Sequence, residues 1–208
     1  MTTSYLVPAR SAEAEIEVKR SRFLAVVRRV DDEAAARAVV EELRRTHWEA
    51  RHHCSAFVLG PARAVERSSD DGEPAGTAGA PMLEVLRGAE VSDVVAVVVR
   101  WFGGTLLGAG GLVRAYGDAV RLALDEAGTR RRALFHEFVL PLPHADAGRV
   151  ESELRSRGVA VLDTSYGAEV ALRVGVADPG PLAGWLAELT AGRVVAEPAG
   201  ERWVDLSL

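Results

Sequence analysis

Three acidic side chains lie within four residues about a third of the way along the chain, in a segment rich in glycine. Asp70, Asp71 and Glu73 stand beside Gly72 and Thr77 in the run SDDGEPAGTAGAP. Carboxylates this close either hold a hard cation, which prefers several oxygen ligands, or act as an acid–base pair. The alternative is a turn in which the acids are solvated or accept hydrogen bonds from backbone amides. The spaced further ligands of an EF-hand are missing, so that site is excluded.

A second segment, FGGTLLGAGG, follows a continuous apolar run and precedes a helical pattern. Amides at the start of a helix are unpaired and lie at the positive end of its dipole, so they bind anions. The alternative is a strained turn with close helix-to-sheet packing. No Lys-Ser/Thr pair follows the last glycine, so the segment is not a phosphate-binding P-loop. The glycine spacing of the Rossmann dinucleotide-binding motif is also absent. Arg100 and Arg114 flank the segment and pair either with an anion or with the first loop's acids.

Histidine and cysteine lie together at 52–54 in HHC. Neighbours on a strand point to opposite faces, so only His52 and Cys54 can share a site, and two ligands do not make a zinc site. His47 with Cys54 would form a nucleophile pair, whereas the structural alternative is a buried Cys54 beside a hydrogen-bonded His52. The sequence has no Gly-x-Ser-x-Gly motif, the nucleophile elbow of α/β-hydrolases, so a hydrolase of that class is not supported.

The elements that must position these groups follow from apolar periodicity. The predicted order is strands at 14–18 and 22–30, a helix from the acids at 31–33 to about Thr46, a strand at 52–60, a loop at 67–81, a short helix at 82–87, a buried strand at 93–101 and a helix at 112–127. The last helix carries one apolar stripe, formed by Leu112, Tyr116, Ala119, Val120 and Ala123. Both candidate loops therefore adjoin strands of one sheet.

Residues 128–132 (GTRRR) mark the predicted domain boundary, with the arginines read either as a phosphate contact or as a solvated linker. Beyond them the pattern predicts a strand at 135–142, a helix at 144–157, strands at 159–163 and 168–176, a helix capped by Asp178, and a strand at 193–206. That βαββαβ order is the ferredoxin-like unit. The fold class expected is therefore α+β, in two domains.

Composition bounds the remaining possibilities. The chain has 208 residues, 48% apolar and 26% charged, with a formal net charge of −5. This balance argues against a general polyanion-binding surface but allows a local basic patch. A single cysteine excludes an internal disulfide and multi-cysteine metal sites. The N-terminal sequence does not resemble a signal peptide, and the longest apolar run, 94–99, is far shorter than a membrane span. We therefore expect a cytoplasmic protein without membrane contact.

Two long motifs make the sequence recognisable. SDDGEPAGTAGAPML (69–83) and VVVRWFGGTLLGAGGLVRAYGDAV (97–120), with KRSRFLA (19–25) and HWEARHHCSAF (47–57), resemble the IMPACT family, including its bacterial YigZ-like members. The resemblance implies an N-terminal α/β sandwich at 1–128, similar to domain IV of elongation factor G. It also implies a ferredoxin-like domain at 133–208, similar to that factor's C-terminal module.

The resemblance also implies a function. Eukaryotic relatives are tied to translational control under amino-acid starvation, through a large partner of the stress kinase, and nucleic-acid or ribosome binding has been suggested for bacterial members. The family signature maps onto Asp70, Asp71, Gly72, Glu73, Thr77, Arg100, Phe102, Gly103, Gly104, Gly108, Gly110, Gly111 and Arg114, which we take as the binding residues. This sequence departs at Ala75, Trp101 and Thr105-Leu106, where the family has Ser, Tyr and Ile-Lys. The missing lysine removes one cation from the glycine-rich segment.

The expected function is non-enzymatic binding of the ribosome, RNA or a translation-regulatory protein, with no DNA, cofactor or metal. Both loops and both flanking arginines would then meet on one face. The alternative is a metal-assisted enzyme acting on a small phosphorylated or carboxylated metabolite. In that case Asp70, Asp71 and Glu73 hold Mg²⁺ or act as base, and residues 103–111 hold the anion. A third reading makes both motifs purely structural.

Overall fold

The computed structural model describes residues 3–206, which divide into two compact units. The first unit contains residues 3–132 and Leu206, and the second contains Ala133–Asp205. Leu206 belongs to the first unit, where its N–H donates to the Arg131 carbonyl oxygen at 2.9 Å. The predicted domain limits at residues 1 and 208 lie outside the described residues.

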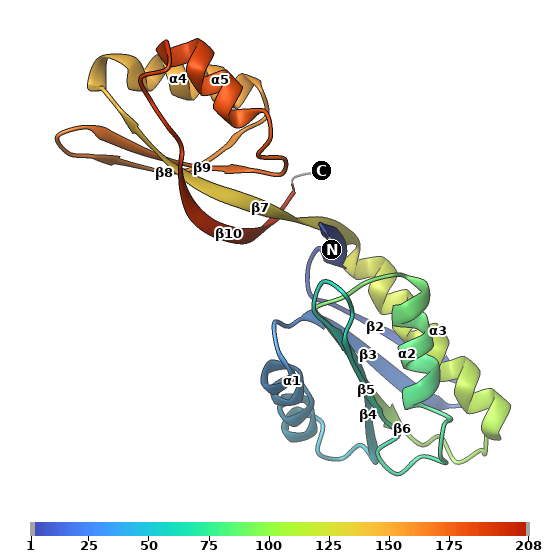
Figure 1. The fold of residues 1–208 in the computed structure, drawn as a ribbon. Helices are drawn as coiled ribbons and strands as arrows, with labels where there is room; N and C mark the ends of the chain where they lie inside the picture. The colour runs from blue at the N-terminus through green and yellow to red at the C-terminus, as the bar shows by residue number, and fades with distance from the viewer. Residues whose placement is uncertain (1–2, 207–208) are drawn as a thin grey trace. The chain divides into compact units, whose positions relative to one another are not determined.

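The first unit is built on a five-stranded antiparallel sheet. Its spatial order is β2 (Ala12–Val18), β3 (Ser21–Arg29), β6 (Val94–Trp101), β4 (His52–Leu59) and β5 (Val65–Ser69). Helix α1 (Glu33–Thr46) covers one face, and α2 (Gly79–Gly88) and α3 (Ala109–Ala127) cover the other (Figure 1). β1 (Ser4–Pro8) is not a strand of this sheet and forms an isolated parallel bridge from Leu6 to Val91.

The central strand β6 shows why this three-layer arrangement forms. Side chains alternate between the two faces of a strand. Val94, Ala96 and Val98 therefore enter the core under α2 and α3, whereas the intervening valines at 95, 97 and 99 enter the core under α1. The strand is buried on both faces, as its unbroken apolar run predicts.

Helix α3 confirms its predicted apolar stripe but begins earlier than expected. All five stripe residues, Leu112 to Ala123, are buried against the sheet. The helix starts at Ala109 rather than 112, so Gly110 and Gly111 form its first turn instead of a loop. The predicted loop at 67–81 is also shorter, because β5 extends to Ser69 by pairing with β4.

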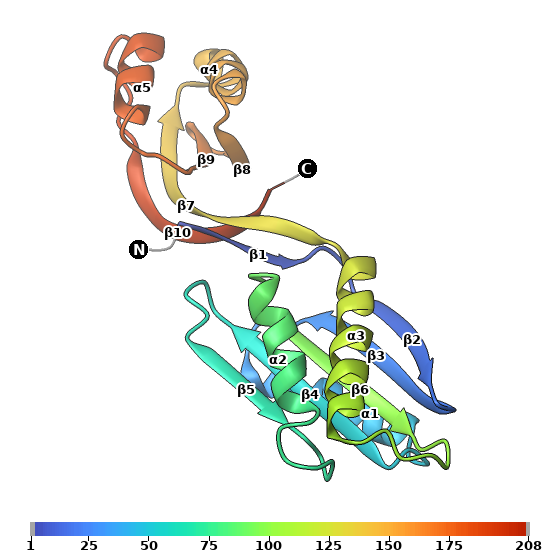
Figure 2. The same ribbon diagram turned by 90° about the vertical axis from the view of Figure 1, so that its right-hand side faces the viewer.

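The second unit has the element order β7 (Thr129–Leu142), α4 (His144–Ser156), β8 (Ala160–Tyr166), β9 (Val170–Val176), α5 (Leu182–Thr190) and β10 (Glu197–Asp205). In the sheet, β7 lies between β10 and β9, and β8 follows β9. Both helices cover the same face of this sheet (Figure 2). Order and pairing confirm the ferredoxin-like prediction and the α+β fold class.

Two expectations for this region are wrong. β7 begins at Thr129, so the arginines at 130–132 are strand residues rather than a solvated linker, and Arg132 lies 3.6 Å from Asp93. Asp178 does not cap α5: the N-cap residue is Pro181, and the Asp178 carboxylate instead accepts from the Gly180 N–H at 3.0 Å. Among the described helices, none has the length and apolar character needed to cross a membrane.

Candidate functional site

The two loops singled out by the sequence meet at one end of the first unit. We call residues 70–78 the acidic loop and residues 102–108 the glycine loop. Both contribute to a cavity of about 420 Å³, the interloop pocket. Its lining comprises Glu73 and Pro74 from the acidic loop, Phe102, Leu106, Leu107 and Gly108 from the glycine loop, and Arg51, His52, Arg100, Ala109 and Leu112 around them.

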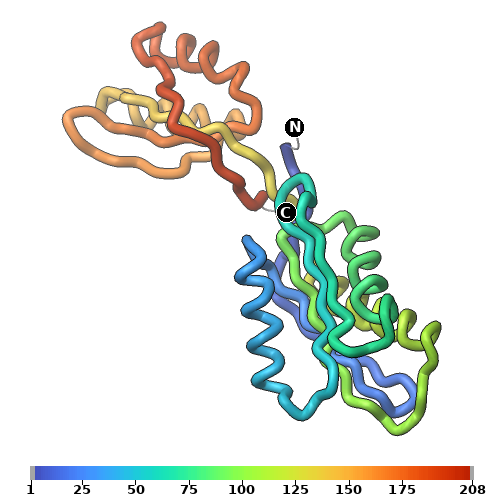
Figure 3. Tube along the Cα trace, turned by 60° about the horizontal axis from the view of Figure 1, so that its bottom comes forward, coloured from blue at the N-terminus to red at the C-terminus, as the bar shows by residue number. Residues whose placement is uncertain are grey.

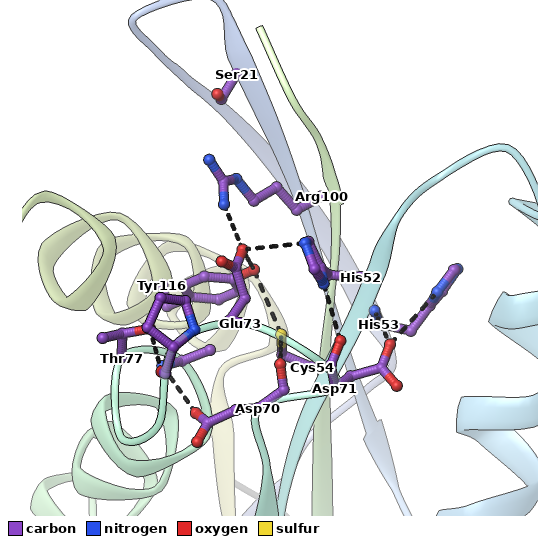
Figure 4. Close-up of polar contacts among 12 residues, drawn as sticks. Ser21, His52, His53, Cys54, Asp70, Asp71, Glu73, Thr77, Arg100 and Tyr116 are labelled. Carbon is purple, nitrogen blue, oxygen red and sulfur yellow. Dashed lines mark hydrogen bonds and ion pairs between the residues drawn. The ribbon is translucent and has the colours of Figure 1, made fainter. Parts of the chain in front are cut away.

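A buried polar network lies beneath this pocket (Figure 4). Glu73 Oε1 accepts hydrogen bonds from Arg100 Nη1 and, at 2.7 Å, from the Tyr116 hydroxyl. Cys54 Sγ lies 3.3 Å from the Tyr116 hydroxyl. Burial raises the pKa of both the Tyr116 hydroxyl and the Cys54 thiol, and the pKa of the thiol reaches about 12. Both groups are therefore protonated donors at neutral pH, and Cys54 is not a thiolate nucleophile.

Asp70 organises the acidic loop itself. Its carboxylate accepts from the backbone N–H groups of Gly76, Ala78 and Gly79, at 2.7, 3.0 and 2.8 Å. Burial opposes ionisation of this carboxyl, but the three donors outweigh it and lower the pKa of Asp70. Asp70 thus ties the loop to the start of α2. Thr77 supports the same turn by donating to the Pro74 carbonyl at 2.6 Å.

Asp71 is directed away from Asp70, towards α1 and β4. It accepts from Arg44 Nη2 at 2.7 Å and from the His53 N–H at 2.6 Å. Since Glu73 binds Arg100 instead, the three carboxylates have three separate sets of partners. The alternative in which they jointly hold Mg²⁺ is therefore wrong for this geometry, and the described residues contain no group of three His, Cys, Asp or Glu arranged for a metal ion.

His52 and Cys54 share a face of β4, as predicted, but they do not form a catalytic pair. His52 Nδ1 lies 2.8 Å from the Asp71 carbonyl oxygen, and its Nε2 lies 4.0 Å from Glu73 Oε1. Cys54 Sγ donates to the Asp70 carbonyl at 3.0 Å. His47 stacks edge-on against Trp101 at 5.4 Å instead of meeting Cys54. This result favours the structural reading of the cysteine.

The glycines have different roles. A Cβ on Gly103 would lie 2.0 Å from the Arg20 carbonyl carbon, so this glycine permits close approach of the β2–β3 turn (Figure 3). Gly104 and Gly108 have φ values of +84° and +74° and face open space, and Gly110 is also open. Gly111 lies against Leu107. Gly72, at φ +86°, lies against His52. Anion binding by this segment stays a prediction, and it is restricted to Gly108 and the first turn of α3.

Arg114 does not join this site. It lines a separate groove between α2 and α3, with Glu84 and Asp118 among its neighbours. Successive helical residues are about 100° apart, so Arg114 lies far around the helix from Leu112, which faces the pocket. The expectation that Arg100 and Arg114 share one face is wrong. Arg51 and His52, by contrast, are pocket residues missing from the predicted set: β4 pairs with β6, which places His52 opposite Arg100.

Comparison with known proteins places the chain in a family. Residues 19–124 match the Impact N-terminal domain, and residues 140–193 match the domain of unknown function DUF1949. IMPACT family member YigZ of Escherichia coli is 43% identical over 173 residues, covering 82% of this chain and 85% of that protein. IMPACT family member YvyE of Bacillus subtilis is 37% identical over 195 residues, covering 93% and 90%.

The structural comparison agrees. A crystal structure described as that of a hypothetical protein superposes with a TM-score of 0.65 and 38% identity, covering 96% of this chain and 98% of that one. Both domain matches, the relatives that match over most of their length and the shared fold lead to one conclusion. The chain belongs to the IMPACT family, of the type represented by the bacterial proteins YigZ and YvyE.

Proposed function

We propose that this protein binds RNA of the translation apparatus through the pocket end of its first unit. The observation that carries this proposal is a set of exposed rings and apolar side chains accompanied by arginines. Trp48 is 80% exposed, Leu106 is 83% exposed and Phe102 is 42% exposed. Large apolar side chains at such exposure are typical of interaction sites, and aromatic rings in particular stack on unpaired bases.

Cations accompany these side chains. Arg51 is exposed at the pocket and has no ion-pair partner among the described residues. Arg20, in the exposed β2–β3 turn, donates to Thr105 Oγ1 at 3.1 Å and so lies over the glycine loop. Arg22 lies 4.6 Å from the centre of the Trp101 ring while it forms an ion pair with Glu15. Arginine beside aromatic rings is the usual composition of a surface that binds single-stranded nucleic acid.

The negative overall charge is compatible with this role because screening makes electrostatic contacts local. At physiological salt the Debye length is about 8 Å, so distant acidic residues do not cancel a cationic patch. The translational link of eukaryotic IMPACT proteins, implied by the family resemblance, supports the ribosome as the location of the RNA. No specific observation in the described residues favours the metal-assisted enzyme.

Co-sedimentation with ribosomes and separated subunits, at low and moderate salt, tests the proposal. We expect binding that weakens with salt, because phosphate contacts release counterions. Arg51→Ala and Trp48→Ala should each reduce binding severalfold. Arg114→Ala is the matched control, since Arg114 is an exposed arginine of the same unit in a different groove.

Two outcomes would contradict the proposal. Absence of sedimentation at both salt concentrations would refute binding to the ribosome. Equal losses from Arg51→Ala and Arg114→Ala would show that the pocket end is not the binding surface.

A further inference from the structure

The interloop pocket contains the start of a long helix that no side chain of the described residues caps. Helix α3 has 19 residues, and its N-cap residue, Gly108, provides no side-chain hydrogen bond. No acidic residue occupies its first turn. The first N–H groups of a helix have no partner within the helix, and they carry a partial positive charge. Gly108 and Ala109 line the pocket, so this charge faces its interior.

Arg100 gives a second and independent indication of a ligand. Its side chain is 7% exposed, lines the pocket and forms a hydrogen bond through Nη1 to Glu73. Its Nε is enclosed by protein without a partner, whereas Nη2 is not among the buried unpartnered atoms and makes no hydrogen bond to the described residues, so Nη2 is the donor left for a ligand. Figure 4 shows the rest of the guanidinium extending away from Glu73. Guanidinium donors are suited to carboxylate and phosphate oxygens, and burial without such partners is costly.

The charges in the pocket favour an anion. Glu73 is the one acidic lining residue, and its Oε1 is engaged by both Arg100 and Tyr116. Arg51 adds a positive charge at the opening, and His52 adds an imidazole. One carboxylate therefore faces two arginines and a helix start, which leaves net positive charge for a ligand to neutralise.

The shape of the pocket distinguishes a terminal group from a chain passing through. Its buried lining residues, Arg100, Glu73 and Leu112, form a floor, whereas Phe102, Leu106 and Arg51 are exposed at the rim. A group at the end of a molecule can enter such a pocket, but a polymer cannot continue through it. The volume of about 420 Å³ is in the range of small-ligand sites.

We infer that the interloop pocket binds a phosphomonoester, the group carried by a free nucleotide or by the 5′ end of an RNA chain. The phosphate lies against the start of α3, Arg100 and Arg51, and the attached nucleoside lies against Phe102 and Leu106. The RNA source rests on the proposed function, whereas the free nucleotide does not. A phosphomonoester carries up to two negative charges, which matches the surplus of positive charge.

Paired probes test the inference. A short RNA with a 5′-phosphate is compared with the same RNA bearing a 5′-hydroxyl, and AMP is compared with adenosine, by fluorescence anisotropy and calorimetry. The informative variant is Ala109→Asp, which puts a carboxylate at the exposed start of α3. Because acids stabilise helix N-termini, this variant should keep its fold, which thermal unfolding verifies. Ala109→Asn is the uncharged control, and Arg114→Ala tests the separate groove.

We expect each phosphorylated probe to bind at least about tenfold more tightly than its unphosphorylated partner. Ala109→Asp should abolish that difference, Ala109→Asn should reduce it less than Ala109→Asp does, and Arg114→Ala should retain it. Equal binding of the two RNAs would overturn the RNA source, and equal binding of AMP and adenosine would overturn the free-nucleotide source. If both pairs bind equally, the inference fails. Unchanged discrimination in folded Ala109→Asp would also overturn it, because the phosphate would then bind elsewhere.

The outcomes separate this inference from the proposed function. If the RNAs with a 5′-phosphate and a 5′-hydroxyl bind equally well, the proposed function is supported, but the pocket does not bind the 5′ end of RNA. If AMP binds but neither RNA nor the ribosome does, the phosphomonoester site is supported and the proposed function is contradicted. Absence of binding by all four probes overturns the phosphomonoester inference.

Discussion

Arg100 on β6 and Glu73 in the acidic loop form an ion pair whose side chains are only 7% and 4% exposed. The two residues are 27 positions apart, so the pair fastens the acidic loop onto the central strand. Tyr116 of α3 donates to the same Glu73 oxygen and brings the helix into the network. One carboxylate thus joins sheet, helix and loop beneath the pocket.

Replacing Glu73 should destabilise the fold strongly. In Glu73→Gln the Arg100 guanidinium loses its counter-ion while remaining buried. Breaking a buried pair in this way costs about 3–5 kcal/mol of unfolding free energy. Glu84→Gln is the control, because Glu84 forms an ion pair with Arg87 but is 67% exposed, and its loss should change stability by less than about 1 kcal/mol. Urea denaturation measures both.

A double-variant cycle isolates the pair itself. Arg100→Met should also be destabilising, because it leaves Glu73 buried without its cation. The combination of Glu73→Gln with Arg100→Met removes both charges, so its loss should be smaller than the sum of the two single losses. Additive losses would mean that the two side chains do not interact in solution.

Most elements of this fold could be predicted from local sequence because their signals are local, but the strands β1 and β5 were not predicted. The valine run of β6 and the apolar stripe of α3 each reflect burial within one element. The sequence also indicated that an arginine beside the glycine-rich segment would pair with an acid, and Arg100 does so with Glu73. Local signals could not show that Arg100, rather than Arg114, would pair with an acid of the acidic loop, because that depends on how α3 is rotated against the sheet.

The candidate site depends on contacts between distant segments, so much of it could not be predicted. Arg51 and His52 reach the pocket because β4 pairs with β6, a neighbour relation that periodicity does not encode. Gly103 fits against Arg20, which lies 83 positions earlier, so its spacing within the glycine-rich segment conveys nothing of this contact. Asp70 accepts hydrogen bonds from amides up to nine residues away. Only the folded loop therefore shows that this carboxylate binds backbone amides rather than a metal ion.

Two glycines of one motif should respond oppositely to alanine. Gly103→Ala places a methyl group 2.0 Å from the Arg20 carbonyl carbon, so backbone must move, and we expect a loss of about 2–4 kcal/mol. Gly110→Ala meets nothing within 4 Å in the first turn of α3 and should stabilise the protein by about 0.5–1 kcal/mol. Thermal and urea unfolding compare them. Similar effects from both variants would contradict this assignment of roles.

Asp70 should contribute stability that disappears in acid. Its pKa is lowered in the folded protein, because three backbone donors outweigh burial. A lowered pKa means that the contribution is present above the ordinary aspartate value of about 3.9 and is lost as the pH falls towards the folded-state value. Asp70→Asn should therefore cost about 1–3 kcal/mol at neutral pH and clearly less near pH 3. Urea unfolding across this range measures the difference.

The control for this pH dependence is Asp118→Asn. Asp118 is an exposed acid that pairs with Arg121 on the surface of α3, so its replacement should change stability little at any pH. A difference between wild type and Asp70→Asn that stays constant from neutral to acidic pH would show that the charge of Asp70 does not stabilise the loop.

Cys54 should be inert while the protein is folded, which separates its structural role from a nucleophilic one. Burial raises the pKa of its thiol to about 12, and its Sγ is fully enclosed between the Asp70 carbonyl and Tyr116. At pH 8 the reactive thiolate is therefore a very small fraction, whereas an ordinary cysteine, with a pKa of about 8.5, ionises appreciably. We expect negligible alkylation by iodoacetamide over hours in buffer and complete alkylation in urea, as measured by mass spectrometry.

The control is Ala62→Cys, which introduces an exposed thiol into the same chain, and that site should react within minutes under native conditions. Native labelling of Cys54 at a comparable rate would show that the thiol is ionised and accessible, and would restore the nucleophile hypothesis.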